Sequence, residues 1–156
     1  MDIKCSESYY VRKLLLETKI KMIMTMKVVS IGEGEPFNHV EEKFKIHRIR
    51  HLPVVDKDNK VVGVISQRDL YKIQSPRKLE DGTWYYDSEM LDQFILNRVM
   101  NKEVLVLNPE NSVADAVLKM VDTKYGCIPI VDKDNVLCGI ITQVDVLKLA
   151  AQILRQ

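Results

Sequence analysis

Two short motifs in the sequence place a carboxylate three residues after a hydroxyl side chain, and each directly follows an apolar run. They are Ser66-Gln-Arg-Asp69 and Thr142-Gln-Val-Asp145. An ionised aspartate only accepts hydrogen bonds, so its two oxygens can hold the vicinal hydroxyls of a ribose. The start of a helix also presents unpaired N–H groups and partial positive charge, which suit a phosphate. The motifs are therefore candidate sites for a ligand that carries both groups.

The same spacing also has a purely structural interpretation. Ser/Thr-x-x-Asp is close to a capping box, in which the hydroxyl and the carboxylate satisfy backbone donors of their own helix. One motif taken alone favours this capping interpretation. Capping and binding are nevertheless compatible, because an aspartate has two oxygens.

Patterns typical of catalysis or of metal binding do not occur in the sequence. It contains no G-x-S-x-G, no H-E-x-x-H, no P-loop and no dinucleotide-type glycine fingerprint. The three cysteines, Cys5, Cys127 and Cys138, form no C-x-x-C pair and have no histidine at ligand spacing. That pattern fits neither a disulfide framework nor a zinc site and points to the reducing cytoplasm. We expect no catalytic residue, no metal and no cofactor.

Length and charge narrow the class of protein further. The chain has 156 residues, 46% of them hydrophobic, and a formal net charge of +1. This length suits one domain, or two half-size units that share a core. A near-zero net charge argues against a nucleic-acid binder, and no apolar run approaches the roughly 18 residues that span a bilayer. We expect a soluble protein with neither nucleic acid nor membrane as a partner.

An internal repeat places the two motifs at equivalent positions. When the chain is shifted by 76 residues, 11 of the 24 positions from Arg50 to Ile73 are identical to their counterparts. The register continues upstream without a gap, since Met24 matches Met100 and Lys43 matches Lys119. The sequence therefore contains two copies of about 50 residues, 23–73 and 99–149.

Each copy predicts the same β-α-β-β-α order. A short strand leads into a helix, two strands follow around the turn DKDN, and a short helix begins at the hydroxyl of the motif. The expected strands are 28–31, 52–55 and 61–65 in the first copy, with 104–107 opening the second. Ser112 is a good N-cap for the helix of the second copy. One copy offers too little core to be stable alone, so we expect an α+β fold in which the two copies pack sheet against sheet.

The remaining segments predict additional helices. Val11, Leu14 and Leu15 share one face of a helix expected over 8–22, and a further helix is expected over 146–154. In the connector, Asp81-Gly82 predicts a turn. A helical stripe follows it and packs on the module or on a partner chain; its residues are Met90, Leu91, Phe94 and Ile95. The predicted organisation is 1–22, 23–73, 74–98 and 99–156.

The repeated segments LPVVDKDNKVVGVISQRDL and IPIVDKDNVLCGIITQVDV resemble the signature of the CBS domain. That signature is a hydrophobic-Pro-hydrophobic-Val-Asp strand followed by Gly, two hydrophobic residues and Ser/Thr-x-x-Asp. IMT at 23–25 and VMN at 99–101 resemble the start of each CBS repeat. The resemblance implies a Bateman module, with two repeats related by pseudo-twofold symmetry and two equivalent clefts. Such modules typically bind adenosine-containing ligands and pair into flat homodimers.

The resemblance also implies which residues line each cleft. The stronger cleft is expected to contain Thr25, Val29, Arg50, His51, Thr142 and Asp145. The weaker cleft is expected to contain Ser66, Asp69, Asn101, Leu105, Gly126 and Cys127. Arg50 and His51 can pair with phosphate oxygens, whereas Gly126 and Cys127 supply no cation, although Arg68 beside Asp69 offers one. We therefore expect the Asp145 cleft to be the tighter, phosphate-bearing site.

These residues lead to one functional hypothesis and two open alternatives. The hypothesis is a non-catalytic sensor of AMP, ADP or ATP that changes repeat or dimer packing and thereby signals to an unidentified effector protein. The first alternative is a dimerisation or docking module without a physiological ligand. The second is a module that binds S-adenosylmethionine or a cyclic dinucleotide.

Overall fold

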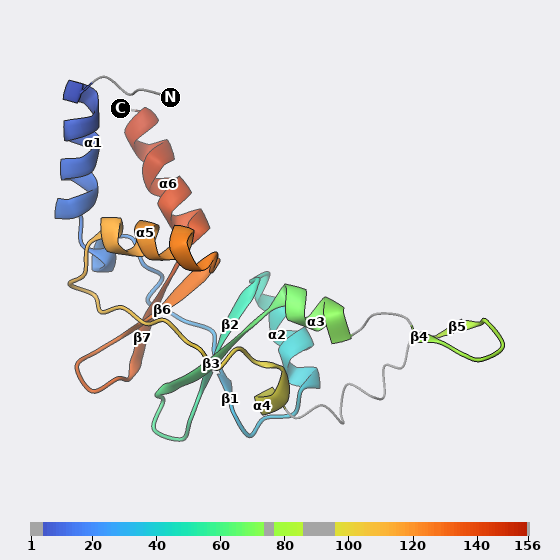
Figure 1. Ribbon diagram of the computed structural model, residues 1–156. Helices are drawn as coiled ribbons and strands as arrows, with labels where there is room; N and C mark the ends of the chain where they lie inside the picture. Colours follow the sequence, from blue (N-terminus) through green and yellow to red (C-terminus); the bar gives the residue numbers. More distant parts are fainter. Residues whose placement is uncertain (1–4, 74–76, 86–95, 156) are drawn as a thin grey trace. The chain divides into compact units, whose positions relative to one another are not determined.

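The computed structural model describes residues 5–73, 77–85 and 96–155, which form two compact units (Figure 1). Unit 1 comprises Met1–Val28 and Leu105–Gln156, and unit 2 comprises Val29–Val104. The units do not coincide with the sequence repeats. The segment that opens each repeat, residues 23–28 or 99–104, belongs to the unit that contains the rest of the other repeat. We call these two stretches the lead segments.

Unit 2 is built around a three-stranded sheet with the order β1-β2-β3. Its strands are β1 (Ile31–Gly32), β2 (His51–Val55) and β3 (Val61–Ser66), and its helices are α2 (Asn38–His47), α3 (Gln67–Ile73) and α4 (Leu96–Val99). β1 runs parallel to β2, and β2 runs antiparallel to β3. The lead segment 99–104 adds an antiparallel bridge at the free edge of β3, where Asn101 pairs with Val64.

Unit 1 repeats this plan. Its strands are β6 (Cys127–Val131) and β7 (Leu137–Thr142), and its helices are α1 (Cys5–Glu17), the 3-10 turn η1 (Ile20–Met22), α5 (Val113–Thr123) and α6 (Gln143–Leu154). The lead segment 23–28 forms an antiparallel bridge to β7, where Thr25 pairs with Ile140. Leu107 forms a parallel bridge to Ile130, at the place that β1 occupies in unit 2. The predicted α+β order is confirmed.

The DKDN turns form as the sequence predicts. Asp56 Oδ1 accepts hydrogen bonds from the backbone N–H groups of Asp58 and Lys60, both at 2.9 Å. Asn59 adopts a positive φ of 60°, which asparagine tolerates better than most residues. Asp132 and Asn135 make the same turn in the second repeat. These contacts fix the register of both hairpins.

Three kinds of element have a different length in the structure from the length predicted from the sequence. The first strands of the repeats are shorter, because only Ile31, Gly32 and Leu107 meet a partner strand. The helix expected over 8–22 ends at Glu17. The Thr18 carbonyl accepts the N–H of Val113, the first residue of α5, and Ile20 N–H donates to the Asn111 carbonyl in the preceding loop, both at 2.9 Å. The terminal helix is longer than expected, because α6 runs without a break from Gln143 to Leu154.

The connector contains a hairpin at the predicted turn. Strands β4 (Arg77–Lys78) and β5 (Trp84–Tyr85) pair antiparallel around Gly82, whose φ is 90°. Asp81 Oδ1 accepts the backbone N–H of Thr83 at 2.8 Å. The predicted stripe at Met90, Leu91, Phe94 and Ile95 lies outside the described residues.

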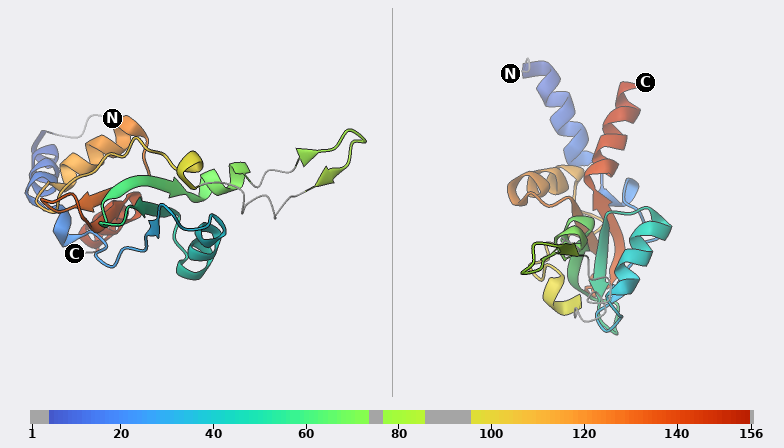
Figure 2. Two further views of the ribbon diagram at one scale, coloured as in Figure 1. Left: turned by 90° about the horizontal axis from the view of Figure 1, so that it is seen from below. Right: turned by 90° about the vertical axis from the view of Figure 1, so that its right-hand side faces the viewer.

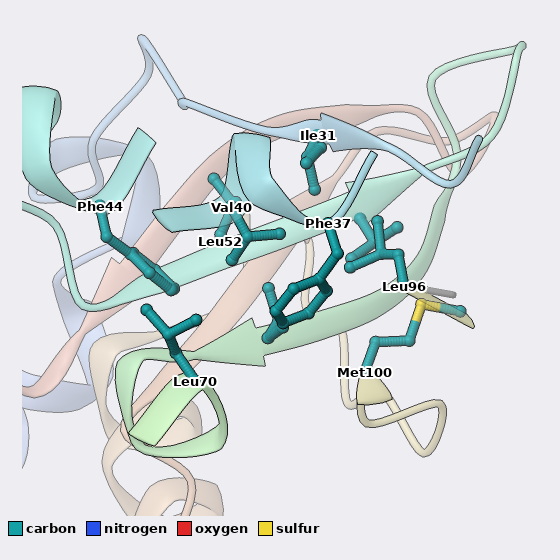
Figure 3. Packing of buried hydrophobic residues seen from close by; sticks show 10 residues of the cluster. Ile31, Phe37, Val40, Phe44, Leu52, Leu70, Leu96 and Met100 are labelled. Carbon is teal, nitrogen blue, oxygen red and sulfur yellow. The ribbon is translucent and has the colours of Figure 1, made fainter. Parts of the chain in front are cut away.

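The core of unit 2 fills the space between α2 and the sheet (Figure 3). Phe37, at the start of α2, is almost fully buried among Ile31, Val40, Leu52 and Leu96. The core of unit 1 is a second cluster with Ile128, Ile130 and Ile141 of the hairpin at its centre. Each unit thus buries the inward faces of one helix and one hairpin.

Each lead segment crosses its sheet at a glycine. A Cβ atom on Gly63 would lie 2.8 Å from Met100 Cγ, and a Cβ atom on Gly139 would lie 2.5 Å from Met24 Sδ. Real Cβ atoms do not approach other heavy atoms so closely, because non-bonded atoms repel one another at distances below van der Waals contact. Only glycine at these two positions therefore leaves room for the methionine side chain of the lead segment that packs against the hairpin.

Glu35 closes the turn before α2. Its Oε1 accepts the backbone N–H of Gly32 at 2.8 Å, and its Oε2 lies 3.2 Å from His39 Nδ1 and 3.9 Å from Lys43 Nζ. The hydrogen bond from Gly32 is the main reason that the pKa of Glu35 is lowered, and His39 and Lys43 add to the effect. The ionised carboxylate is therefore the form that the folded turn favours.

We expect the free energy of unfolding to decrease in acid, because the Glu35 carboxylate becomes protonated there. A carboxylate whose pKa is lower in the folded state stabilises the protein at pH values above its unfolded-state pKa of about 4.3. This contribution is lost as the pH falls through the folded-state pKa. Urea unfolding between about pH 7 and pH 3 should show a smaller pH dependence in Glu35→Gln than in the wild type. Glu33→Gln, at an exposed carboxylate on the same turn, serves as the control. Equal pH dependence in Glu35→Gln and the wild type would contradict the assignment.

Candidate functional site

Both predicted aspartates form capping boxes with the hydroxyl residue three positions earlier. Asp69 Oδ2 accepts hydrogen bonds from Ser66 N at 2.9 Å and Ser66 Oγ at 2.6 Å. Asp145 Oδ2 accepts hydrogen bonds from Thr142 N at 2.9 Å and Thr142 Oγ1 at 2.7 Å. In both boxes a single oxygen, Oδ2, accepts these two bonds. The sequence interpretation that capping and binding are compatible therefore agrees with the geometry.

A third box with the same geometry lies elsewhere in unit 1. Asp115 Oδ2 accepts hydrogen bonds from Ser112 N at 2.9 Å and Ser112 Oγ at 2.8 Å. This box begins α5 and follows a loop, whereas the other two directly follow β3 and β7. The Ser/Thr-x-x-Asp geometry alone therefore does not distinguish a binding position from a cap, and the neighbouring residues must do so.

In unit 1, five predicted residues lie at or near the start of α6. Cys127 lies opposite Thr142 in the β6–β7 register, and the Gly126 carbonyl accepts the N–H of Gln143 at 3.2 Å. Thr25 exchanges two backbone hydrogen bonds with Ile140, two residues before Thr142. Asp145 is buried here, and its Oδ1 lies 3.7 Å from Lys148 Nζ.

In unit 2, the equivalent residues surround the start of α3. His51 lies opposite Ser66 in the β2–β3 register, and the Arg50 carbonyl accepts the N–H of Gln67 at 2.9 Å. Asn101 exchanges two backbone hydrogen bonds with Val64, two residues before Ser66. The two units therefore present the same arrangement around one carboxylate. We call each arrangement a constellation; its residues are Thr25, Gly126, Cys127, Thr142 and Asp145 in unit 1 and Asn101, Arg50, His51, Ser66 and Asp69 in unit 2.

The remaining predicted residues, Val29 and Leu105, are apolar and half-buried. Val29 packs against the core of unit 2, and Leu105 packs against the core of unit 1. The predicted group of Thr25, Thr142 and Asp145 lies within unit 1. Arg50 and His51 lie beside Ser66 in unit 2, so their expected pairing with Asp145 stays a prediction. The same holds for the expected pairing of Gly126 and Cys127 with Asp69.

The two constellations differ sharply in charge. Burial lowers the pKa of His51, the neighbouring charge of Arg50 and that of Arg68 lower it further, and Asp69 partly offsets them. In unit 2 the imidazole of His51 therefore lies within electrostatic reach of Arg50, Arg68 and Asp69. The counterparts of Arg50, His51 and Arg68 in unit 1 are Gly126, Cys127 and Val144. Burial raises the pKa of Cys127 to about 12, so that thiol is neutral at physiological pH.

Sequence reasoning missed the contacts made by the lead segments. It assigned Thr25 and Asn101 to the site by resemblance and did not anticipate that each pairs with the hairpin of the other repeat. Part of the signal was available, since Met24 and Met100 recur at the repeat distance, as do Gly63 and Gly139, but this recurrence does not say that each methionine meets the glycine of the other repeat. A repeated large residue and a repeated glycine are the complementary halves of one packing contact.

Comparison with known proteins assigns the family. The family model for the CBS domain matches residues 20–75 and 96–152. The chain belongs to the CBS domain family. None of the helices in the described part of the chain has the length and apolar character of a membrane span, and the same residues contain no cluster of three or more potential metal ligands.

Solved CBS domain structures share the fold over most of the chain. A CBS domain-containing protein from Bacillus anthracis is 24% identical with a TM-score of 0.75, covering 90% of this chain and 98% of that one. CBSX2, solved in complex with AMP, is 23% identical with a TM-score of 0.70, covering 87% and 98%. The CBS domain pair of MJ0100, in complex with 5′-methylthioadenosine and S-adenosyl-L-methionine, is 22% identical with a TM-score of 0.69, covering 85% and 99%. The first curated relatives are homoserine O-acetyltransferases, and this chain spans only about a quarter of their length.

Proposed function

We propose that this CBS domain pair is a cytoplasmic regulatory module, not an enzyme, and that it binds adenosine nucleotides of the AMP, ADP and ATP class. The observation that carries the proposal is the constellation repeated in both units, with a carboxylate at a helix start beside one end of a hairpin. The AMP complex of CBSX2 supports it, because that protein shares the fold.

Each group in the constellation has a chemical role in this proposal. In unit 1, Asp145 uses Oδ2 for its cap, so Oδ1 is the oxygen that would accept ribose hydroxyls. Backbone N–H groups at the start of α6 would favour a phosphate. In unit 2, Ser66 and Asp69 take the same roles, and Arg68, which precedes Asp69 in the sequence, adds positive charge that favours phosphorylated ligands.

Regulation requires more than binding. A ligand changes the packing of the module only if it binds two packing states with different affinities. The proposed readout of that difference is a partner surface recognised by an effector protein. S-adenosylmethionine remains the second candidate ligand, because the MJ0100 pair was solved with it.

Thermal melts with AMP, ADP, ATP and S-adenosylmethionine test the proposal. A ligand at 100 times its dissociation constant adds about 2.7 kcal/mol to the free energy of unfolding. We expect Asp145→Ala to remove most of the AMP-induced shift and Asp69→Ala to remove less, because Arg50 and His51 are expected to serve the Asp145 site. No shift with any of these compounds would overturn the proposal.

Asp115→Ala is the matched control for loss of a cap. All three alanine variants remove the carboxylate at the third position of a capping box, so each should weaken the start of its helix. Only Asp115 lies outside the constellations, so its variant should melt earlier and yet keep the full AMP shift. A larger loss in Asp69→Ala than in Asp145→Ala would reverse the ranking and make the cluster in unit 2 the main phosphate site.

A further inference from the structure

Three arginines lie at the open end of the β2–β3 hairpin in unit 2. Arg48 follows the last turn of α2, Arg50 precedes β2, and Arg68 lies in the first turn of α3. The Arg50 carbonyl accepts the N–H of Gln67 at 2.9 Å, so the start of α3 lies beside the entry to β2. Figure 2 shows α3 directly beyond the end of β3. We call Arg48, Arg50 and Arg68 together the basic edge.

All three arginines of the basic edge are exposed. Within residues 5–73, 77–85 and 96–155, none of them forms an ion pair with a carboxylate. The charges of Arg50 and Arg68 both lower the pKa of His51, so the two guanidinium groups lie near the same imidazole. Like charges that lie close together repel one another, and an anion that contacts several of them relieves this repulsion. The basic edge is therefore suited to an anionic partner.

The basic edge is not repeated in the sequence of unit 1. The counterparts of its residues there are Lys124, Gly126 and Val144. Lys124 retains the cation at the helix end, and its φ of 60° is similar to the 51° of Arg48. A cation at this position suits the negative end of the helix dipole. That role accounts for one cation in each unit, and Arg50 and Arg68 need a different explanation.

An exposed aromatic side chain borders the basic edge. Tyr71 lies three residues after Arg68 on the same face of α3 and is 60% exposed. Phe44 of α2 and Leu70 of α3 point toward one another in the core, so the two helices lie side by side here (Figure 3). Arginine and tyrosine are enriched among the residues that contribute most to binding at protein–protein interfaces. The combined surface therefore resembles a protein-binding site.

The positive charge is confined to a small area. Glu41 and Glu42 lie on α2 before Arg48, and Asp69 follows Arg68. Nucleic acids present a continuous row of phosphates and need a more extended basic surface. A short acidic segment of a protein needs only a few cations, since a guanidinium can hold a carboxylate through two parallel hydrogen bonds. The charge and the exposed ring favour an acidic segment that also contains an apolar side chain.

We infer that the basic edge and Tyr71 bind an acidic segment of the effector protein, and that the phosphate of a bound nucleotide displaces this segment. The displacement rests on the proposed function, in which Arg50 is expected to serve the Asp145 site and Arg68 favours phosphorylated ligands in unit 2. The segment and the phosphate then use the same guanidinium groups. Arg48 is not expected to contact the nucleotide, so a variant of Arg48 separates docking from nucleotide binding.

Fluorescence anisotropy with the full chain tests the docking. The probe is a fluorescein-labelled, glutamate-rich peptide with a central phenylalanine, used at low ionic strength. Arg48→Gln should weaken peptide binding about three- to fivefold, as for an exposed ion pair of good geometry, and leave the AMP-induced shift in melting temperature unchanged. Lys124→Gln is the matched control, because Lys124 is also exposed and ends the equivalent helix with a positive φ. It should bind the peptide as the wild type does.

Several outcomes of this titration would overturn the docking. They are a wild type that does not bind the peptide, an Arg48→Gln variant that binds it equally well, and an equal loss in Lys124→Gln. Replacing the peptide's phenylalanine with alanine should weaken binding, and an unchanged affinity would remove Tyr71 from the surface. A short oligonucleotide that binds more tightly than the peptide would identify nucleic acid as the partner instead.

Competition with AMP tests the displacement. AMP should lower the anisotropy to that of the free peptide, whereas adenosine, which lacks the phosphate, should leave the peptide bound. A peptide that stays bound although melts show AMP binding would refute the displacement and leave the proposed function intact. An absence of any AMP-induced shift would refute the proposed function and the displacement together, while the peptide titration still decides the docking.

Discussion

Replacing Gly63 with valine is expected to lower the free energy of unfolding by about 3 kcal/mol, the upper end of the range for overpacking a core. A Cβ atom at this position already lies 2.8 Å from Met100 Cγ and 3.2 Å from Met100 Cβ. Met100 is held by the bridge between Asn101 and Val64, so its Cβ cannot move away without breaking that pairing. Denaturant unfolding followed by circular dichroism measures the loss.

A second variant shows whether the loss arises from this contact. Met100→Ala removes the side chain that valine would strike, so the double variant should be more stable than the sum of the single effects predicts. The expected coupling is between about 0.5 and 3 kcal/mol, as for residues in direct contact. Gly34→Val is the control, because no heavy atom lies within 4 Å of a Cβ placed there. Additive single effects would refute the proposed contact.

Phe37→Ala is expected to cost about 3–5 kcal/mol, the range for removing a large aromatic side chain from a core. Phe37 is 1% exposed and packs between α2 and the sheet of unit 2 (Figure 3). Its loss leaves a cavity lined by Ile31, Leu52 and Leu96, which are held by different elements and cannot all close on it.

The matched measurement uses Ile46→Ala on the same helix. Ile46 is exposed, so its truncation should change the free energy of unfolding by no more than about 0.5 kcal/mol. Hydrogen exchange should show that the effect of Phe37→Ala is concentrated in unit 2. A cost below about 1.5 kcal/mol, or an equal cost in Ile46→Ala, would mean that Phe37 does not anchor this core.

Local patterns in the sequence were sufficient to predict the hairpins and helix starts that contain the site residues. The DKDN turns fix both hairpins because Asp56 and Asp132 bond to N–H groups only two and four residues away. The hydroxyl–carboxylate spacing predicts both helix starts for the same reason, since Ser66 and Thr142 bond to an aspartate three residues later. Interactions this short in sequence leave a signature within a few residues.

Long-range contacts could not be predicted in the same way. Thr25 pairs with Ile140, and Asn101 pairs with Val64, so each lead segment completes the sheet of the other repeat. Such partners depend on the path of the chain, which no local pattern encodes. The length of the N-terminal helix was missed for the same reason, because the backbone at Ile20 bonds to Asn111, which is distant in sequence.

The crossing of each methionine over a glycine also constrains how the duplicated halves can diverge. Gly63 lies in the first repeat and contacts Met100 of the second repeat, whereas Gly139 lies in the second repeat and contacts Met24 of the first. A substitution that enlarges either glycine is tolerated only with a compensating change in the other half of the gene. The two halves are therefore expected to evolve as a linked pair at these positions, and an exchange of one repeat between relatives should succeed only when both glycine–methionine contacts are kept.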